Sequence, residues 1–415
     1  MRKAMNVVIL EPVSSGWKLI PKAKELNHTV IVLTYDQGER IIPAEFLRLA
    51  DRIERVDTND DQAVIDLAWK LDKELGIDAV IPGFEYYVPL SNRINHLLGN
   101  AGLNPEVVDH LRYKDLMRTA LADAGVRVPR YRLVTDAEEL EAAAAYVGFP
   151  LVAKPVDCSG SFNVRKANNH SELEEAYRRI AEMAVNDLEQ TARGDVLLEE
   201  YLQGPEYSVE GLVAGETIHY FSITEKLLGP EPYFVEVGHI VSAPLDAEAE
   251  KNIHHYVSQV IKALGINMGP FHAEIRLTST GPVLIEIGVR LAGDYICDLI
   301  YHAKGIDLYK LMIDSYLGNP LSLPEQTAQR VAGVRFFVRE NLKRYDTVEG
   351  LEQLRALDGL IDCNLTIPTG QEIPEANSFM GRIGYFAVVA DDYDRLKETL
   401  LQGDRQIKFK QLTKK

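Results

Sequence analysis

The chain has 415 residues, enough for two or three domains, with 46% hydrophobic and 26% charged residues, as in ordinary globular proteins. A net charge of −17 argues against a broad surface for nucleic acid or an anionic membrane, so we expect neither partner. The three cysteines form no Cys-x-x-Cys pair and the apolar runs are too short for a signal peptide or a membrane span, which predicts a soluble cytoplasmic protein without a disulfide framework.

The first hundred residues are predicted to form an α/β unit. Apolar runs at 6–10 and 29–34 are typical of buried strands, with a helix near 17–26 between them. A helix near 61–75 then leads to a strand at 78–82. Strands that alternate with helices form parallel sheets, and ligands bind at the loops after their carboxyl ends.

Those loops carry polar residues but no G-x-G-x-x-G dinucleotide fingerprint. The residues that could contact a substrate, or serve only in the turns, are Ser14, Ser15, Gly16 and Glu85.

Two lysines and a loop rich in serine and glycine come next. Lys114 lies in a helix predicted over 109–124, and Lys154 lies near the end of a short apolar strand, 149–155. The loop that follows, 157–163, offers backbone N–H groups and hydroxyls to an anion. It lacks the Walker sequence, and the same composition is also typical of a plain turn.

A helix is predicted from 171 to about 190, followed by three strands at 196–201, 207–213 and 217–226. The segment after them carries Glu236 and His239, of which the histidine alone is better explained as a structural residue than as a catalytic one. A helix at 246–264 leads into the next strands.

Residues 271–294 alternate apolar and polar positions, which predicts two strands joined by a turn at 279–281. If Thr278 faces Pro282, the same register places Glu274 opposite Glu286.

Facing glutamates require neutralisation, because their Cβ atoms would lie about 4.5–5.5 Å apart. Mg²⁺ commonly takes one or two carboxylates plus substrate phosphates. Arg290, just beyond the second strand, is suited to a phosphate. A solvated hairpin face with exposed charges is the alternative interpretation.

The last part of the chain changes character after Pro324. Predicted strands at 331–339, 360–367 and 382–390, with helices near 348–357 and 392–401, indicate an α+β module with no catalytic constellation of its own.

The order of these features resembles the ATP-grasp superfamily. The matching features are Lys114, Lys154, the Ser/Gly loop, the strand Leu-Glu-Glu-Tyr-Leu, Glu206, Glu274, Glu286 and Arg290. The spacing Glu236-x-x-His239 and the ending E-I-G-V-R resemble the L-amino acid ligases, which make dipeptides from free amino acids.

The resemblance covers nearly the whole chain and implies an α/β fold in three parts. These are an N-terminal parallel α/β pre-ATP-grasp domain (1–105), a two-lobed ATP-grasp domain (106–325, with a lid subdomain at about 130–203) and a C-terminal α+β module (326–415).

The resemblance also implies ligands for each site. The residues implied to bind ATP are Lys114, Lys154, Ser159, Gly160, Ser161, Glu199, Glu200, Tyr201, Leu202 and Glu206. Glu274 and Glu286 would bind Mg²⁺, with Mn²⁺ as an alternative ion. Gly288 stands where the superfamily pattern has an asparagine ligand, which leaves the number of ions open.

Catalytic roles are implied for Arg290, which would steady the transferred phosphoryl group, and for Glu236 and His239, which would face the amino acid site. Glu85, Gly293 and Asp294 would contact the substrate. A carboxylate such as Asp294 needs a partner if it is desolvated. That partner is either a fixed Lys or Arg of the protein or a basic or amide side chain of the first amino acid.

The implied activity joins the carboxylate of one amino acid to the amine of another through an acyl-phosphate, with release of ADP and phosphate. Alternatives are a carboxylate–amine ligase for other substrates, a carboxylase component, and a nucleotide-binding protein without catalysis. The expected partners are amino acid substrates, that is, small molecules, and a homodimer is compatible with the sequence.

Overall fold

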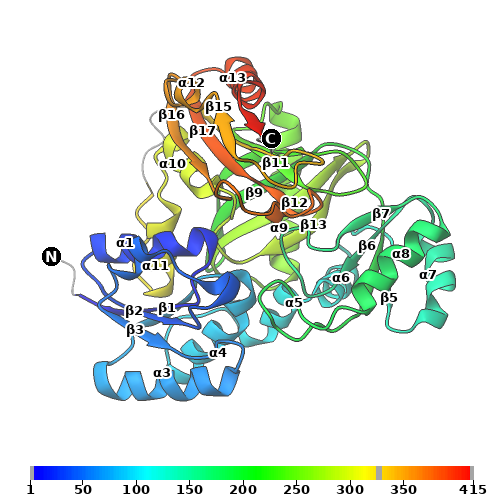
Figure 1. Ribbon diagram of the computed structural model, residues 1–415. Helices are drawn as coiled ribbons and strands as arrows, with labels where there is room; N and C mark the ends of the chain where they lie inside the picture. The colour runs from blue at the N-terminus through cyan, green and yellow to red at the C-terminus, as the bar shows by residue number, and fades with distance from the viewer. Residues whose placement is uncertain (1–3, 324–329, 412–415) are drawn as a thin grey trace.

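The structure is a computed structural model that describes residues 4–323 and 330–411. Its main layers are three sheets: a parallel N-terminal sheet, a four-stranded lid sheet and a long central sheet that continues into the C-terminal residues. Figure 1 shows the N-terminal part (blue) and the lid (teal) on either side of the central sheet, with the C-terminal residues (orange and red) at its far end. The predicted α/β fold class is confirmed.

The N-terminal sheet has the strand order β3-β2-β1-β4, all parallel. Its elements are β1 (Asn6–Leu10), α1 (Leu19–Glu25), β2 (Thr29–Thr34), α2 (Ala44–Leu47), β3 (Arg52–Arg55), α3 (Asp61–Leu75), β4 (Ala79–Pro82) and α4 (Val88–Leu98). β3, α2 and α4 were not predicted. β3 is short and its sequence, RIER, is mostly charged.

The loops after β1 and β4 pass each other in close contact. A Cβ atom on Gly16 would lie 1.9 Å from the carbonyl oxygen of Gly83, so the first of these positions accepts only glycine without movement of the backbone. This close approach brings the two loops that were predicted to contact substrate to one place.

The lid sheet has the order β5-β8-β6-β7 and is covered by two helices. Its elements are β5 (Tyr131–Val134), α7 (Leu140–Val147), β6 (Leu151–Pro155), β7 (Arg165–Ala167), α8 (His170–Ala181) and β8 (Val196–Glu200). The helix predicted to continue to about 190 ends at Ala181, because the chain there turns into a loop held by the side chain of Asn186.

Lys114 lies at a break in a helix that was predicted to be continuous over 109–124. The structure has α5 (Val108–Arg112) and α6 (Lys114–Asp123), separated by Tyr113 in an extended conformation. The backbone N–H of Lys114 donates to the carbonyl of Val156 at 3.0 Å, which joins the start of α6 to the end of the lid strand β6.

The central sheet has the order β13-β12-β9-β10-β11-β14-β17-β16. Its strands up to residue 323 are β9 (Glu206–Ala214), β10 (Thr217–Leu228), β11 (Glu236–Val241), β12 (Met268–Thr278) and β13 (Gly281–Gly288), with helices α9 (Ala247–Ala263), α10 (Ile296–Lys304) and α11 (Leu308–Tyr316).

C-terminal strands extend this sheet, because β14 pairs antiparallel with β11. The C-terminal elements are β14 (Val331–Phe336), β15 (Thr347–Glu349), α12 (Leu351–Arg355), β16 (Leu360–Leu365), β17 (Gly384–Ala390), α13 (Tyr393–Gln406) and β18 (Lys408–Lys410). Ile240 of β11 packs into the same apolar cluster as Phe337 and Phe386. The domain limits stay a prediction, and the one at 325/326, like Pro324, lies outside the described residues.

The turn of the β12–β13 hairpin differs from the predicted one. Thr278 pairs with Gly281 and not with Pro282, so two residues, 279 and 280, form the turn instead of three. A register predicted from this turn alone would place Glu274 one position away from Glu286.

A β-bulge restores the predicted pairing of the two glutamates. Glu274 pairs with Glu286 while Ile275 pairs with Leu284, so Ile285 is an extra residue in β13. The carbonyl of Ile285 accepts a hydrogen bond from the guanidinium of Arg118.

Within the two described ranges, 4–323 and 330–411, no helix is long and apolar enough to cross a membrane.

Candidate active site

Two adjoining cavities lie where the N-terminal sheet, the lid and the central sheet meet. The lid cavity lies between the lid strands and the β12–β13 hairpin, and the N-terminal cavity lies between that hairpin and the loops after β1 and β4. Six residues line both cavities: Ser159, Gly160, Glu236, His272, Glu274 and Arg290. The cavities therefore share a wall in which four of the six residues have ionisable side chains.

All ten residues implied to bind ATP line the lid cavity. The amino group of Lys114 donates to the carbonyl of Cys158 at 2.5 Å and lies 3.1 Å from Oε2 of Glu286. The amino group of Lys154 lies 2.6 Å from Glu199, whose other oxygen lies 2.6 Å from Nε of Arg118. The Glu199 side chain is thus committed to two fixed cations.

Burial is the largest influence on the pKa of Lys154. Burial lowers the pKa of Lys154, the Glu199 carboxylate only partly offsets this, and the result is a pKa of about 8. An anion such as a phosphate beside Lys154 would raise this pKa and favour the charged amine further.

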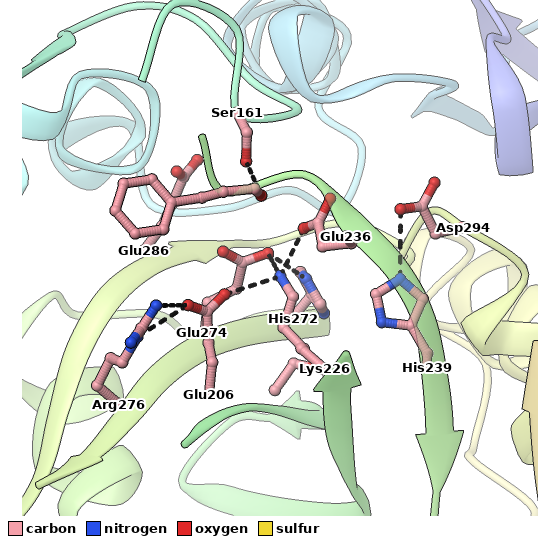
Figure 2. A network of polar contacts seen from close by, with 12 residues as sticks. Ser161, Glu206, Lys226, Glu236, His239, His272, Glu274, Arg276, Glu286 and Asp294 are labelled. Atoms are coloured by element: carbon pink, nitrogen blue, oxygen red, sulfur yellow. Dashed lines mark hydrogen bonds and ion pairs between the residues drawn. The ribbon is translucent and has the colours of Figure 1, made fainter. Parts of the chain in front are cut away.

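Glu206 faces the lid cavity and is held by Arg276, with Nε and Nη2 of the guanidinium 3.0 Å from the carboxylate. Ser161, in the loop after β6, donates to the carbonyl of Phe234 at 3.3 Å (Figure 2). This bond ties the Ser/Gly loop to the segment before β11.

Glu274 is enclosed by cations. Its Oε1 accepts from Lys226 and lies 3.1 Å from Nε2 of His272 (Figure 2). Nδ1 of the same histidine lies 2.9 Å from Glu210. Burial disfavours the carboxylate charge, but Lys226 and His272 outweigh it and hold the pKa of Glu274 well below its usual range. Burial lowers the pKa of Lys226, but the carboxylates of Glu236, Glu274 and Glu206 outweigh it and raise the pKa well above its usual range.

Glu286 has the opposite balance. Burial raises the pKa of Glu286, and Lys114 only partly offsets this because Glu85 and Glu274 lie nearby. A second cation beside this carboxylate would therefore be stabilising.

The donor set fits a Mg²⁺ ion that is bound together with phosphates. Glu274 and Glu286 are opposite each other, and their side chains are 22% and 19% exposed toward the cavities. Among the described residues, no group of three or more His, Cys, Asp or Glu side chains could form a complete cage. Mg²⁺ typically uses one or two carboxylates and completes its shell with phosphates and water.

Gly288 makes room for Arg290. A Cβ atom at Gly288 would lie 3.3 Å from Cγ of Arg290, whose side chain passes over this residue to reach Glu85. The guanidinium binds one oxygen of Glu85 with Nε at 2.9 Å and Nη2 at 2.7 Å. Burial raises the pKa of Glu85, but Arg290 and Lys114 outweigh it and lower the value to about 2.

Glu236, His239, Gly293 and Asp294 line the N-terminal cavity, as do Glu85, Ser14, Ser15 and Gly16. Nε2 of His239 lies 3.3 Å from Asp294, while Glu236 lies 2.9 Å from Lys226. Every predicted substrate and catalytic residue thus lies on one of the two cavities.

A fixed arginine is the partner of Asp294. Nη1 of Arg382 donates to Asp294 at 2.7 Å, and Nη2 donates to Glu236 at 2.9 Å. Of the two partners considered for Asp294, the structure therefore contains the fixed one. The C-terminal residues, which were expected to carry no constellation of their own, supply this charge and also Phe379 and Met380 to the cavity wall.

Lys226, His272, Arg276 and Arg382 were not predicted as site residues. The alternation of β12 did place His272 and Arg276 on the face of Glu274, so a signal for these two existed. Lys226 and Arg382 reach the site from strands and loops distant in sequence, and nothing local marks them.

Comparison with known proteins agrees with this geometry. Residues 147–298 match the family described as ATP-grasp domain, and residues 342–410 match the L-amino acid ligase C-terminal domain 2. An uncharacterized protein of Sinorhizobium fredii is 31% identical over 94% of this chain and 79% of its own length. Alanine–anticapsin ligase of Bacillus subtilis is 28% identical over 64% of this chain and 59% of its own length.

The chain belongs to the ATP-grasp superfamily. Within it, the chain is similar to the L-amino acid ligases. Its fold is that of the L-amino acid ligase from Bacillus licheniformis, with a TM-score of 0.83, 22% identity and full coverage of both chains. It is therefore an ATP-grasp ligase related to dipeptide-forming enzymes.

Proposed function

We propose that this ligase joins the carboxylate of one amino acid to the amine of another through an acyl-phosphate, with release of ADP and phosphate. The observation that carries the proposal is the shared wall of the two cavities. Glu274 and Arg290 face a cavity lined by Lys114 and Lys154 on one side and a cavity lined by Glu85 and the other substrate candidates on the other. This arrangement suits transfer of a phosphoryl group from a nucleotide to a carboxylate.

Each side chain has a role in positioning and charge. Lys114 and Lys154 would hold the phosphates of ATP, and Glu199–Leu202 with Glu206 would hold the nucleoside. Glu274 and Glu286 would hold Mg²⁺, which when bound neutralises phosphate charge. Arg290 would steady the transferred phosphoryl group, because a guanidinium binds phosphate oxygens in pairs.

No nucleophilic side chain is needed, because positioning and charge neutralisation carry most of phosphoryl transfer. Cys158 lines the lid cavity, but burial raises the pKa of its thiol to about 12, so the thiol stays neutral. The acyl-phosphate must be kept from water. The loop at Ser159–Ser161 lines the lid cavity, with two of its residues in the shared wall, and would cover the reacting groups.

The test is a screen of phosphate release from ATP and Mg²⁺ with free L-amino acids, singly and in pairs, followed by chromatography of the spent nucleotide and mass spectrometry of the product. ADP with a dipeptide is the expected result. AMP as the main nucleotide would contradict the acyl-phosphate mechanism. Release that requires a carboxylate other than an amino acid would favour a different carboxylate–amine ligase.

A further inference from the structure

The loop Asn186–Gln190 connects the lid to the N-terminal part. It lies between α8 and β8, and the Asn186 side chain shapes it by accepting from the backbone N–H groups of Leu188 and Gln190, both at 3.0 Å. Leu188 is 3% exposed and packs in the apolar cluster of the N-terminal sheet, with Val8 and Leu10. A lid segment is therefore anchored in the core of another part of the chain.

Two polar contacts fix this loop further. The amide of Asn59 donates to the carbonyl of Leu188 at 3.0 Å, and Arg40 lies 3.0 Å from Glu189. The Glu189 side chain is 62% exposed and does not line the N-terminal cavity, whereas Asp187 and Leu188 do. In this loop, Glu189 is thus exposed to solvent, while its neighbours Asp187 and Leu188 line the cavity.

The hydroxyl of Tyr86 is the junction between this loop and the Ser/Gly loop. It donates to Asp187 at 2.5 Å and accepts from the backbone N–H of Ser159 at 2.8 Å. Tyr86 itself is 4% exposed. The Asp187 carboxylate is therefore held in place by a neutral hydroxyl, and this hydrogen bond does not neutralise its negative charge.

Most carboxylates of the N-terminal cavity already have a cation. Glu85 pairs with Arg290, Glu236 with Lys226 and Arg382, Glu274 with Lys226, and Asp294 with Arg382. Within the part of the chain that the structure describes, Asp187 and Glu39 are the lining carboxylates without an ion pair, and Glu39 is exposed to solvent.

Arg112 is a cationic side chain whose charge acts on Asp187 from a distance. Its guanidinium lies over the Tyr86 ring and donates to the carbonyl of Asp157 at 2.7 Å and to Gln190 at 3.3 Å. It makes no ion pair with Asp187. Burial raises the pKa of Asp187 despite Tyr86 and Arg112, which is the behaviour of a carboxylate that lacks a direct cationic partner.

We propose that Asp187 binds the ammonium group of an amino acid substrate, and that the lid carries this contact into the N-terminal cavity. The inference rests on the proposed function. An ammonium supplies the cation that a half-buried carboxylate lacks and can hydrogen-bond to it. The ammonium belongs either to the amino acid that is phosphorylated or to the one that attacks, and both share this chemistry.

The test compares Asp187→Asn with wild type and with Glu189→Gln. Asp187→Asn removes the charge but keeps an oxygen that can accept from Tyr86, and Glu189→Gln removes one charge from the same loop outside the cavity. The probe is the pair of L-amino acids, from a screen of the twenty, that gives the highest wild-type rate of phosphate release. The KM of each member is measured with the other saturating, together with the KM of ATP and the thermal melting of each variant.

We expect Asp187→Asn to raise the KM of one amino acid about tenfold or more, as for loss of a charge-assisted hydrogen bond, with the KM of ATP unchanged. The amino acid affected identifies the source of the ammonium, since mass spectrometry of the dipeptide shows which member keeps its free amine. The deaminated analogue of that amino acid, used as a competitive inhibitor, should have the same Ki with both enzymes.

Unchanged KM values for both amino acids would overturn the inference, and so would a Ki for the deaminated analogue that rises in parallel with the KM. In either case the proposed function would stand if wild type forms a dipeptide. Absence of phosphate release with every pair would overturn the proposed function and this inference with it.

Discussion

The carboxylate of Asp294 lies 2.7 Å from Nη1 of Arg382, although the two residues are 88 positions apart. Arg382 is 8% exposed, and its guanidinium carbon lies 4.1 Å from the centroid of the Phe336 ring. The arginine outweighs the burial of Asp294, with a further contribution from His239, and holds the pKa of this carboxyl far below its usual range. The pair ties the chain after β13 to the C-terminal residues.

Replacement of Arg382 by Met should destabilise the protein. It leaves Glu236 and Asp294 without this cation, and breaking a buried pair costs about 3 kcal/mol. The control is Arg330→Met, which breaks an exposed pair with Asp391 and should cost less than about 1 kcal/mol. Urea denaturation measures both. A loss for Arg382→Met no larger than for the control would show that the contact adds nothing to stability.

Glu286→Gln should lower turnover by about 100-fold or more while the fold stays intact, because the change keeps the shape but removes a charge beside Lys114 and the shared wall. Steady-state rates at saturating Mg²⁺ and thermal melting check this. Near wild-type activity would mean that the Glu286 carboxylate has no part in catalysis.

His239→Ala should impair amide formation more than nucleotide binding. His239 lies in the N-terminal cavity beside Asp294 and is absent from the wall of the lid cavity. Product formation and the Kd of ATP are measured on the same variant. A fall in nucleotide affinity with unchanged product formation would place the residue in the ATP site.

Affinity for ATP should fall as the pH rises above about 8. The pKa of Lys154 is about 8 without a ligand, and phosphate binds the protonated form, so raising the pH removes the binding species. The limiting slope is about tenfold per pH unit until the pKa of the complex is reached. Titration calorimetry between pH 7 and 9.5, in buffers of different ionisation enthalpy, should also detect proton uptake.

Lys154→Met provides the matching control, since Glu199 keeps Arg118 as a partner. This variant should bind ATP weakly and without the pH dependence. If the dependence persists in Lys154→Met, another group causes it.

The β12–β13 hairpin shows how far sequence reasoning reaches. Alternation identified both strands and the facing glutamates, yet the turn was one residue shorter than predicted, and the pairing held because a bulge at Ile285 compensated. Strand period follows from local chemistry, whereas a bulge depends on what its carbonyl meets, here Arg118. The correct pairing was therefore reached through an incorrect turn.

Residues that act across the fold could not be predicted in the same way. Lys226 binds Glu274 across 48 positions and Arg382 binds Glu236 across 146. A lysine in a strand and an arginine before one have no pattern that distinguishes them from exposed charges. The resemblance supplied the ATP-side residues, but these pairs depend on packing that only the three-dimensional structure defines.

The pairing of β14 with β11 limits where the chain can be truncated and which segments can be replaced by those of a related protein. Ending the chain before β14 would leave the backbone of β11 as an open edge, and such edges recruit strands from other molecules. It would also remove Phe379 and Met380 from the lining of the N-terminal cavity. A hybrid whose C-terminal residues come from a related ligase would have to keep the register in which His239 pairs with Val334. A shift by one residue would exchange the two faces of the β14 strand, so that different side chains would face the site.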